Sequence, residues 1–324
     1  MRELTYAEAV REAIHEEMKD DQDVIVIGED IGAYGGAYKI TKGFLQEFGP
    51  SRIRDTPISE IAIAGAAIGA ALMGMKPIAE IMFMDFVAIS MEQLINEASK
   101  MHFMSGGKLK VPLVLRTQYS LGRAYGGQHT EFLPAWFLQA PGIKVVVPST
   151  AYDAKGLLKS SVRDGNPVVF IECNLLYSKK GPVPEEPYTI PLGQADVKAS
   201  GKDVSLVAIS RLVPEALTAA DELKTKGISV EVIDPRTIQP LDMKTILESV
   251  RRTRRLVVAS DDVRSGGLGA HIISRVVEEA FYDLDAPVQN VSSPEIVTPF
   301  SAQLEKQYMV NKDKIVEAVS KVVE

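Results

Sequence analysis

Two carboxylates occupy positions from which they could do acid–base chemistry. Glu29 follows the apolar run Val24–Ile27 and lies near the start of Gly28–Gly36, a loop with four glycines. Glu60 opens the segment Ile61–Leu72, which is too rich in Ala, Gly and Ile for an ordinary surface helix. The helix dipole alone would explain an acid in a first helical turn. A carboxylate at the mouth of a buried helix, however, is costly to desolvate unless it meets a partner, which favours a functional role for Glu60.

Among the four histidines, His129 lies in the most promising place. It belongs to Gly126-Gly-Gln-His-Thr130, a loop after an expected strand, where α/β proteins place reacting groups. His15 lies on an acidic helix face and His102 near a helix end, so we interpret both as structural. His271 follows a glycine run that resembles a phosphate turn without its full spacing.

The sequence also argues against several kinds of site and partner. Cys173 is the only cysteine, and no two histidines have helical metal-site spacing, so a multi-cysteine or paired-histidine centre is excluded. A lone cysteine fits a reducing cytoplasm, where we expect the protein. The net charge of −7 argues against nucleic acid as the main partner. We expect no membrane span and no signal peptide, because no apolar run reaches about 18 residues and no apolar leader opens the sequence.

Strand and helix patterns alternate along the first half of the chain. Short apolar runs predict strands at 24–27, 77–82, 112–115, 145–147 and 168–172. Helical patterns lie at 5–19, 41–48, 58–73, 86–104 and 152–163. The first of these opens with the capping box Thr5-Tyr-Ala-Glu8. Such alternation predicts a parallel sheet with its active-site loops at the carboxyl ends of the strands.

The proline-rich segment 179–202 interrupts this alternation. It contains four prolines, which disfavour a regular core element, so we interpret it as an interdomain linker. Strands are then expected at 204–209, 229–233, 256–259 and 288–291, and helices at 213–226, 243–250, 269–280 and 311–323. The sequence therefore predicts an α/β protein of two domains, 1–178 and 203–324. Each is expected to be a mainly parallel sheet flanked by helices.

Several ordered motifs carry a resemblance to a known family. They are Gly28-Glu-Asp-Ile-Gly32, Asp55-Thr-Pro-Ile-Ser-Glu60, Glu80-Ile-Met-Phe-Met-Asp-Phe86, Gln128-His129, Pro141–Pro148 and Asp234–Asp242. Over nearly its whole length the chain resembles the beta subunit of the decarboxylating component of 2-oxoacid dehydrogenase complexes. The resemblance implies a transketolase-like fold, with a thiamine pyrimidine-binding domain at 1–178 and a transketolase C-terminal-like domain at 203–324.

The resemblance also implies roles for the candidate residues. Glu60 would contact the pyrimidine ring nitrogen of thiamine diphosphate and favour the imino tautomer through which the cofactor is activated. Met82 and Phe86 would form the wall of the pyrimidine pocket, and Glu29 would lie near the aminopyrimidine. His129 would face the thiazolium ring, orient the substrate and handle protons during acyl transfer to a lipoyl group. A structural potassium ion is implied at Leu113, Ser161, Val162, Asp164 and Asn166.

The site implied by the resemblance is incomplete in this chain. Thiamine enzymes bind magnesium and diphosphate through Gly-Asp-Gly followed by a distal Asn, and Gly-Asp-Gly is absent here. An alpha subunit would therefore supply that half in an alpha2-beta2 heterotetramer. The further partner would be the lipoyl acyltransferase core, docked on the C-terminal domain through carboxylates that include Asp285 and Glu324.

We expect oxidative decarboxylation of a 2-oxo acid, with pyruvate as the first candidate. One alternative is acetoin cleavage by the same cofactor chemistry, and another is a non-catalytic docking subunit, against which Glu60 and His129 argue. A dinucleotide-dependent oxidoreductase is disfavoured, because no strand leads into G-x-G-x-x-G and a helix.

Overall fold

The computed structural model describes all 324 residues and divides into two compact units. Unit 1 comprises Met1–Ser120 and Trp136–Leu192, and unit 2 comprises Leu121–Ala135 and Gly193–Glu324. The boundary at residue 192 falls inside the segment interpreted as a linker. The loop 121–135, which carries His129, packs with the second unit, although the sequence placed it within the first domain.

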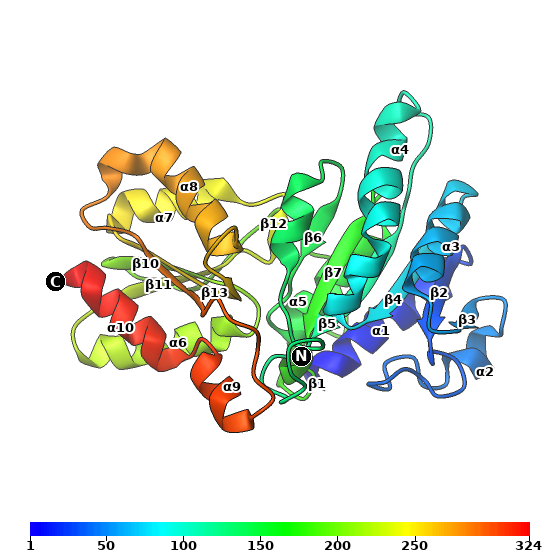
Figure 1. Cartoon of the computed structure of the whole chain (residues 1–324), viewed down its shortest axis with the longest axis horizontal. Helices are drawn as coiled ribbons and strands as arrows, with labels where there is room; N and C mark the ends of the chain where they lie inside the picture. The colour runs from blue at the N-terminus through cyan, green and yellow to red at the C-terminus, as the bar shows by residue number, and fades with distance from the viewer. The chain divides into compact units, whose positions relative to one another are not determined.

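Unit 1 is built on parallel strands in the order β6-β7-β5-β4-β2-β3 (Figure 1). The strands are β2 (Val24–Glu29), β3 (Ile53–Thr56), β4 (Lys76–Met82), β5 (Val114–Tyr119), β6 (Lys144–Val146) and β7 (Val168–Cys173). Most of their residues are buried, as expected for a parallel sheet covered on both faces. Strand β3 was not predicted, because its sequence Ile-Arg-Asp-Thr has too little apolar character to be recognised as a strand.

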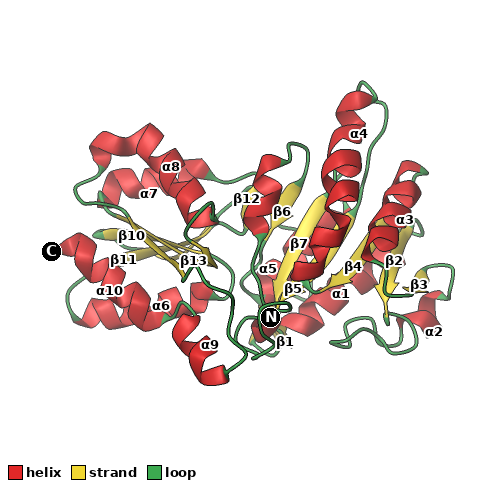
Figure 2. Cartoon of the chain, in the orientation of Figure 1, coloured by secondary structure: helices red, strands yellow, loops and turns green.

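Helices lie on both sides of this sheet (Figure 2). They are α1 (Tyr6–Asp20), α2 (Phe44–Phe48), α3 (Glu60–Leu72), α4 (Ser99–Met104) and α5 (Ala151–Val162). The capping box that opens α1 is confirmed: the Glu8 amide donates to Thr5 Oγ1 at 3.2 Å, and the Thr5 amide donates to Glu8 Oε2 at 2.8 Å.

The single long helix predicted at 86–104 is wound in three different ways. A 3-10 helix spans Met84–Ser90, a π-helix spans Glu92–Ala98, and α4 follows. The sequence pattern predicted the helical path, but hydrophobic spacing does not resolve changes in helical winding.

The proline-rich segment contains two short strands instead of being irregular throughout. Strand β8 (Lys180–Val183) pairs antiparallel with β1 (Arg2–Thr5), and Pro182 lies opposite Glu3. Because this sheet has only two strands, both are edge strands, where a residue without an N–H group is tolerated. Strand β9 (Asp196–Ala199) joins the sheet of unit 2.

Unit 2 has a five-stranded sheet in the order β14-β13-β10-β11-β9, of which only β9 is antiparallel. Its further strands are β10 (Val204–Ala208), β11 (Val230–Asp234), β13 (Leu256–Val263) and β14 (Gln289–Ser293), and the short strand β12 (Thr237–Gln239) lies outside this sheet. Its helices are α6 (Leu212–Thr225), α7 (Met243–Thr253), α8 (Leu268–Ala280), α9 (Ala302–Tyr308) and α10 (Lys312–Val323). The predicted class, two mainly parallel sheets flanked by helices, is confirmed. No helix has the length and apolar character needed to cross a bilayer.

Candidate functional site

Glu60 is the first residue of α3 and is almost completely buried, with 8% of its surface exposed. Its carbonyl oxygen accepts a hydrogen bond of 2.7 Å from Ser90 Oγ, which ties the start of α3 to the 3-10 helix. The helix itself is less buried than its sequence predicts. Ile61 is 52% exposed, and Met73, just after the helix, is 85% exposed. One apolar face of α3 is therefore uncovered in the single chain.

Glu29 ends β2 and lies close enough to Glu60 for their charges to interact. Burial, followed by the negative charge of Glu60, raises the pKa of the Glu29 carboxyl, while the Ser59 amide that donates to it opposes the shift. Its Oε1 atom is buried without a hydrogen-bond partner. A buried carboxylate oxygen in this state is suited to a bound N–H or N–H₂ group. A carboxyl group whose pKa is raised beside a second carboxylate can also hold and release a proton.

Met82 and Phe86 lie at the same carboxyl edge of the sheet as Glu29. Strand β4 pairs with β2 so that Glu80 lies opposite Gly28, and Met82 follows two residues later. Both Met82 and Phe86 are half-buried, and the Phe86 amide donates to the carbonyl of Phe83 at 2.9 Å. Their role as a pocket wall stays a prediction.

Glu29 and Glu60 belong to unit 1, whereas His129 belongs to unit 2. The imidazole is half-buried. The loop turns tightly before it: the His129 amide donates to the Gly126 carbonyl at 3.4 Å, and Thr130 Oγ1 donates to the same oxygen at 2.8 Å. The predicted position in a loop after a strand is thus what the structure has.

Four of the five residues predicted to bind potassium lie between the last turn of α5 and the start of β7, namely Ser161, Val162, Asp164 and Asn166, and the fifth, Leu113, comes just before β5. The carbonyls of Leu113 and Ser161 accept backbone bonds from Val168 at 2.8 Å and Asp164 at 3.3 Å. Asp164 Oδ1 accepts from the amide and the side chain of Asn166 at 2.9 and 3.0 Å. The Lys144 ammonium pairs with the other carboxylate oxygen. The charge of Asp164 is therefore already compensated, and the potassium site stays a prediction.

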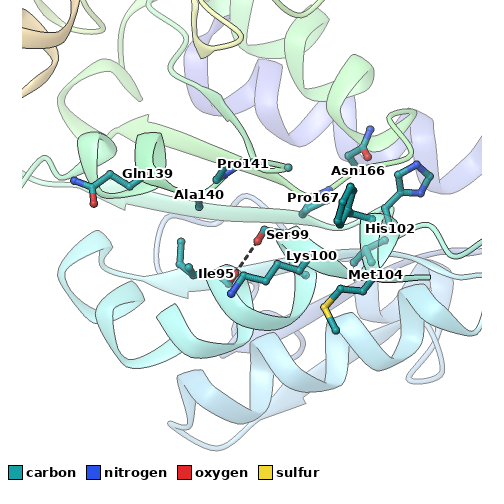
Figure 3. A pocket seen from close by; sticks show the side chains of 14 residues that line it. Ile95, Ser99, Lys100, His102, Met104, Gln139, Ala140, Pro141, Asn166 and Pro167 are labelled. Carbon is teal, nitrogen blue, oxygen red and sulfur yellow. Dashed lines mark hydrogen bonds between the residues drawn. The ribbon is translucent and has the colours of Figure 1, made fainter. Parts of the chain in front are cut away.

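A cavity of about 530 Å³ opens in unit 1, and neither Glu29 nor Glu60 lines it (Figure 3). One wall is the helical segment 95–104, in which Ser99 Oγ donates to the Ile95 carbonyl at 2.7 Å, and loops at 139–142 and 166–167 form the other. His102 lines it, and its Nδ1 bonds to the Leu109 carbonyl at 2.7 Å. Of the predicted site residues only Asn166 reaches this cavity, so it is not the candidate site.

The glycine run before His271 does not form an open phosphate turn. The amide of Leu268, the first residue of α8, donates to Asp262 Oδ2 at 2.5 Å, so a carboxylate already occupies this helix N-terminus. A phosphate there would be repelled by the same charge. Burial raises the pKa of Asp262 to about 6.

A buried ion cluster beneath the carboxyl edge was not predicted. Arg116 on β5 donates through Nη1 to Glu80 on β4 at 2.6 Å and through Nε to Glu172 on β7 at 2.8 Å. The Tyr177 hydroxyl donates to Glu172 at 2.9 Å, and burial raises the pKa of Glu172. The signal available in the sequence was a charged residue inside each of three otherwise apolar strands. The cluster bonds three neighbouring strands to one another.

Comparison with known proteins supports both halves of this description. Residues 2–180 match the family described as transketolase, pyrimidine binding domain, and residues 193–315 match transketolase, C-terminal domain. The subunit beta of the pyruvate dehydrogenase E1 component of Rhizobium meliloti is 42% identical over 323 residues, covering 99% of this chain and 70% of that protein.

A further relative and a solved structure of the same fold each align over almost the full length of both chains. The acetoin:2,6-dichlorophenolindophenol oxidoreductase subunit beta of Bacillus subtilis is 42% identical over 327 residues, covering 97% of this chain and 96% of that one. A solved structure described as a split gene transketolase, inactive beta4 tetramer, aligns with a TM-score of 0.81 at 24% identity, over 99% and 98% of the two chains.

Proposed function

Because the chain belongs to the family of transketolase-type beta subunits that includes those of pyruvate and acetoin dehydrogenases, we propose that it is the beta subunit of a thiamine-diphosphate-dependent 2-oxoacid dehydrogenase component. The assembled enzyme decarboxylates a 2-oxo acid, pyruvate being the first candidate. It then transfers the acyl group to the lipoyl group of an acyltransferase core.

The observation that carries this proposal is a pair of neighbouring carboxylates: the buried Glu60 at the start of α3 and the half-buried Glu29 at the end of β2. Glu60, which is buried, would meet a ring nitrogen of an aminopyrimidine, and the unpartnered Oε1 of Glu29 could accept from its amino group. The residues therefore fit the pyrimidine half of the cofactor. Bound thiamine diphosphate supplies the electron sink for cleaving the bond next to the substrate carbonyl.

The remaining candidates act around this pair. Met82 and Phe86 exclude water from the pyrimidine side, which strengthens the electrostatic contacts of both carboxylates. Glu60 holds the proton that is exchanged with the ring nitrogen. His129 orients the 2-oxo acid and moves a proton when the acyl group passes to the lipoyl sulfur.

This chain supplies half of the site, and an alpha subunit supplies the magnesium and diphosphate ligands in an alpha2-beta2 assembly. The uncovered face of α3 supports such a partner. The exposed Ile61 follows Glu60 directly in α3, and the exposed Met73 comes just after the end of this helix. Exposed apolar patches of this kind mark protein contacts. Potassium at the end of α5 is a further proposal, with a structural role.

We place the contact with the acyltransferase core on unit 2. The two carboxylates predicted to make this contact, Asp285 and Glu324, differ in whether another side chain already pairs with them. Asp285 accepts two bonds of 2.7 Å from Arg254, so it would act as part of an ion pair, whereas Glu324 is an exposed terminal residue. A cluster of such exposed charges steers association more than it stabilises a complex.

Acetoin is the second candidate substrate. The near full-length match with the acetoin-oxidising subunit of Bacillus subtilis favours it as specifically as other matches favour pyruvate. Product analysis of the assembled enzyme with pyruvate, branched-chain 2-oxo acids and acetoin distinguishes the two. If the chain were a non-catalytic docking subunit, the neighbouring carboxylates Glu29 and Glu60 would take no part in a reaction.

Calorimetry with thiamine diphosphate and magnesium tests the half-site proposal. The purified chain alone should bind the cofactor weakly, and the chain with its alpha subunit should bind it tightly. Submicromolar binding by this chain alone would contradict the proposal.

A further inference from the structure

The loop that carries His129 is fastened to the C-terminal part of unit 2 by one buried carboxylate. Glu305, on α9, is 2% exposed. Its Oε1 atom accepts the backbone N–H of Gly122 at 2.8 Å, and its Oε2 atom accepts the backbone N–H of Ala124 at 2.7 Å. A residue of the last helical region thus bonds to a segment about 180 positions earlier.

Both bonded residues have positive φ angles, and that of Ala124 needs support. Gly122 has φ +93° and Ala124 has φ +57°, and the second is unfavourable for a residue with a Cβ atom. Hydrogen bonds donated to an ionised acceptor are about twice as strong as bonds between neutral groups. The carboxylate in turn would be costly to bury without these two donors. The loop and Glu305 therefore stabilise each other.

Packing fixes the next residues of the same loop. A Cβ atom on Gly126 would lie 2.4 Å from the Phe300 ring, and one on Gly127 would lie 2.2 Å from Val297 Cγ1. The glycines thus allow the backbone to lie directly against side chains of the segment that precedes α9. The loop is held at 122–124 by hydrogen bonds and at 126–127 by close contact, just before His129.

We propose that Glu305 is a positioning residue for His129. By holding the loop 121–135 in one conformation, Glu305 sets where the imidazole is presented to the substrate, without touching the substrate itself. This inference rests on the proposed function, in which His129 acts during acyl transfer. It also gives unit 2 a part in the reaction besides docking.

Glu305→Gln in the complete assembly with the alpha subunit tests this proposal. Glutamine has one acceptor oxygen, and its amide group would face a backbone N–H, so one of the two bonds is lost. Amide exchange across 121–131 should accelerate about tenfold, and kcat for acyl transfer to the lipoyl group should fall about tenfold. KM for the 2-oxo acid, which His129 is proposed to orient, should rise. Turnover with an artificial electron acceptor, which needs no acyl transfer to the lipoyl group, should fall less than kcat for acyl transfer.

Two comparisons keep the result interpretable. Glu278→Gln changes an exposed carboxylate on α8 and should alter neither exchange in the loop nor kcat. Glu305→Asp keeps the charge but is one methylene too short to reach both amides, and should show the same pattern if Glu305→Gln fails to fold.

The two proposals fail in different ways. If His129→Ala abolishes acyl transfer while both Glu305 variants leave loop exchange and kcat unchanged, the positioning role is wrong. The role is also wrong if the loop loosens and acyl transfer is unaffected. If His129→Ala itself retains full acyl transfer, the proposed function of His129 is wrong, and the inference falls with it.

Discussion

The buried cluster around Arg116 leads to a strong prediction about stability. The side chains of Arg116, Glu80 and Glu172 are 2%, 6% and 1% exposed, so Arg116→Met leaves two carboxylates buried without their cation. Removing one partner of a buried ion pair costs roughly 3–5 kcal/mol. For a unit of this size, each kcal/mol corresponds to about 2–4 °C in melting temperature, which predicts a fall of about 6–20 °C in the unfolding of unit 1.

The same cluster predicts how pH and compensating changes act on this variant. Burial raises the pKa of Glu172, so its folded form binds a proton more tightly than its unfolded form. Loss of the guanidinium should strengthen this shift, so the variant regains stability as pH falls and loses it as pH rises. Adding Glu80→Gln and Glu172→Gln should restore most of the stability, because no buried charge then remains.

Differential scanning calorimetry at pH 5 and pH 8 measures both effects, with the exposed Arg54→Met as the matched control. If Arg116→Met lowers the melting temperature by less than about 3 °C, the contribution to stability assigned to the cluster is wrong. A triple variant as unstable as the single one would refute the explanation by unpaired charge.

Two further predictions concern unit 2. Burial raises the pKa of Asp262 to about 6, so the folded state binds this proton more tightly than the unfolded state does. Unit 2 should therefore lose up to about 3 kcal/mol of stability as pH rises from 4 through 6. Asp262→Asn should flatten this dependence in thermal unfolding, and an unchanged profile would contradict the assignment. Deleting Glu324 alone should weaken binding to the acyltransferase core and reduce the salt dependence of that binding. A longer deletion is less suitable, because it would also remove the buried Val322. Unchanged affinity and salt dependence would show that the docking surface lies elsewhere.

Elements with strong local signals could be predicted from the sequence. The capping box at Thr5 set the start of α1, and the apolar runs at 24–27 and 77–82 became the neighbouring strands β2 and β4. The acidic residue at the head of an apolar helix indicated Glu60 as buried, which the structure confirms.

What could not be predicted depends on contacts between distant residues. The bonds of Glu305 to the loop 121–135 join segments with no local pattern in common, so the sequence did not indicate that this loop packs against a later part of the chain. The pairing of β1 with β8 has the same origin. The exposed face of α3 was missed because apolar composition predicts burial without saying whether the chain itself or a partner provides it.

Turnover of Glu60→Gln in the assembled enzyme tests the central claim most directly, with the exposed Glu97→Gln as control. If Glu60 exchanges a proton with the cofactor, turnover should fall about a hundredfold or more. The assembly and its melting temperature should change little, since a helix-start acid is worth at most about 1 kcal/mol. Full turnover by Glu60→Gln, with or without a loss of stability, would contradict the assignment of this carboxylate to the reaction.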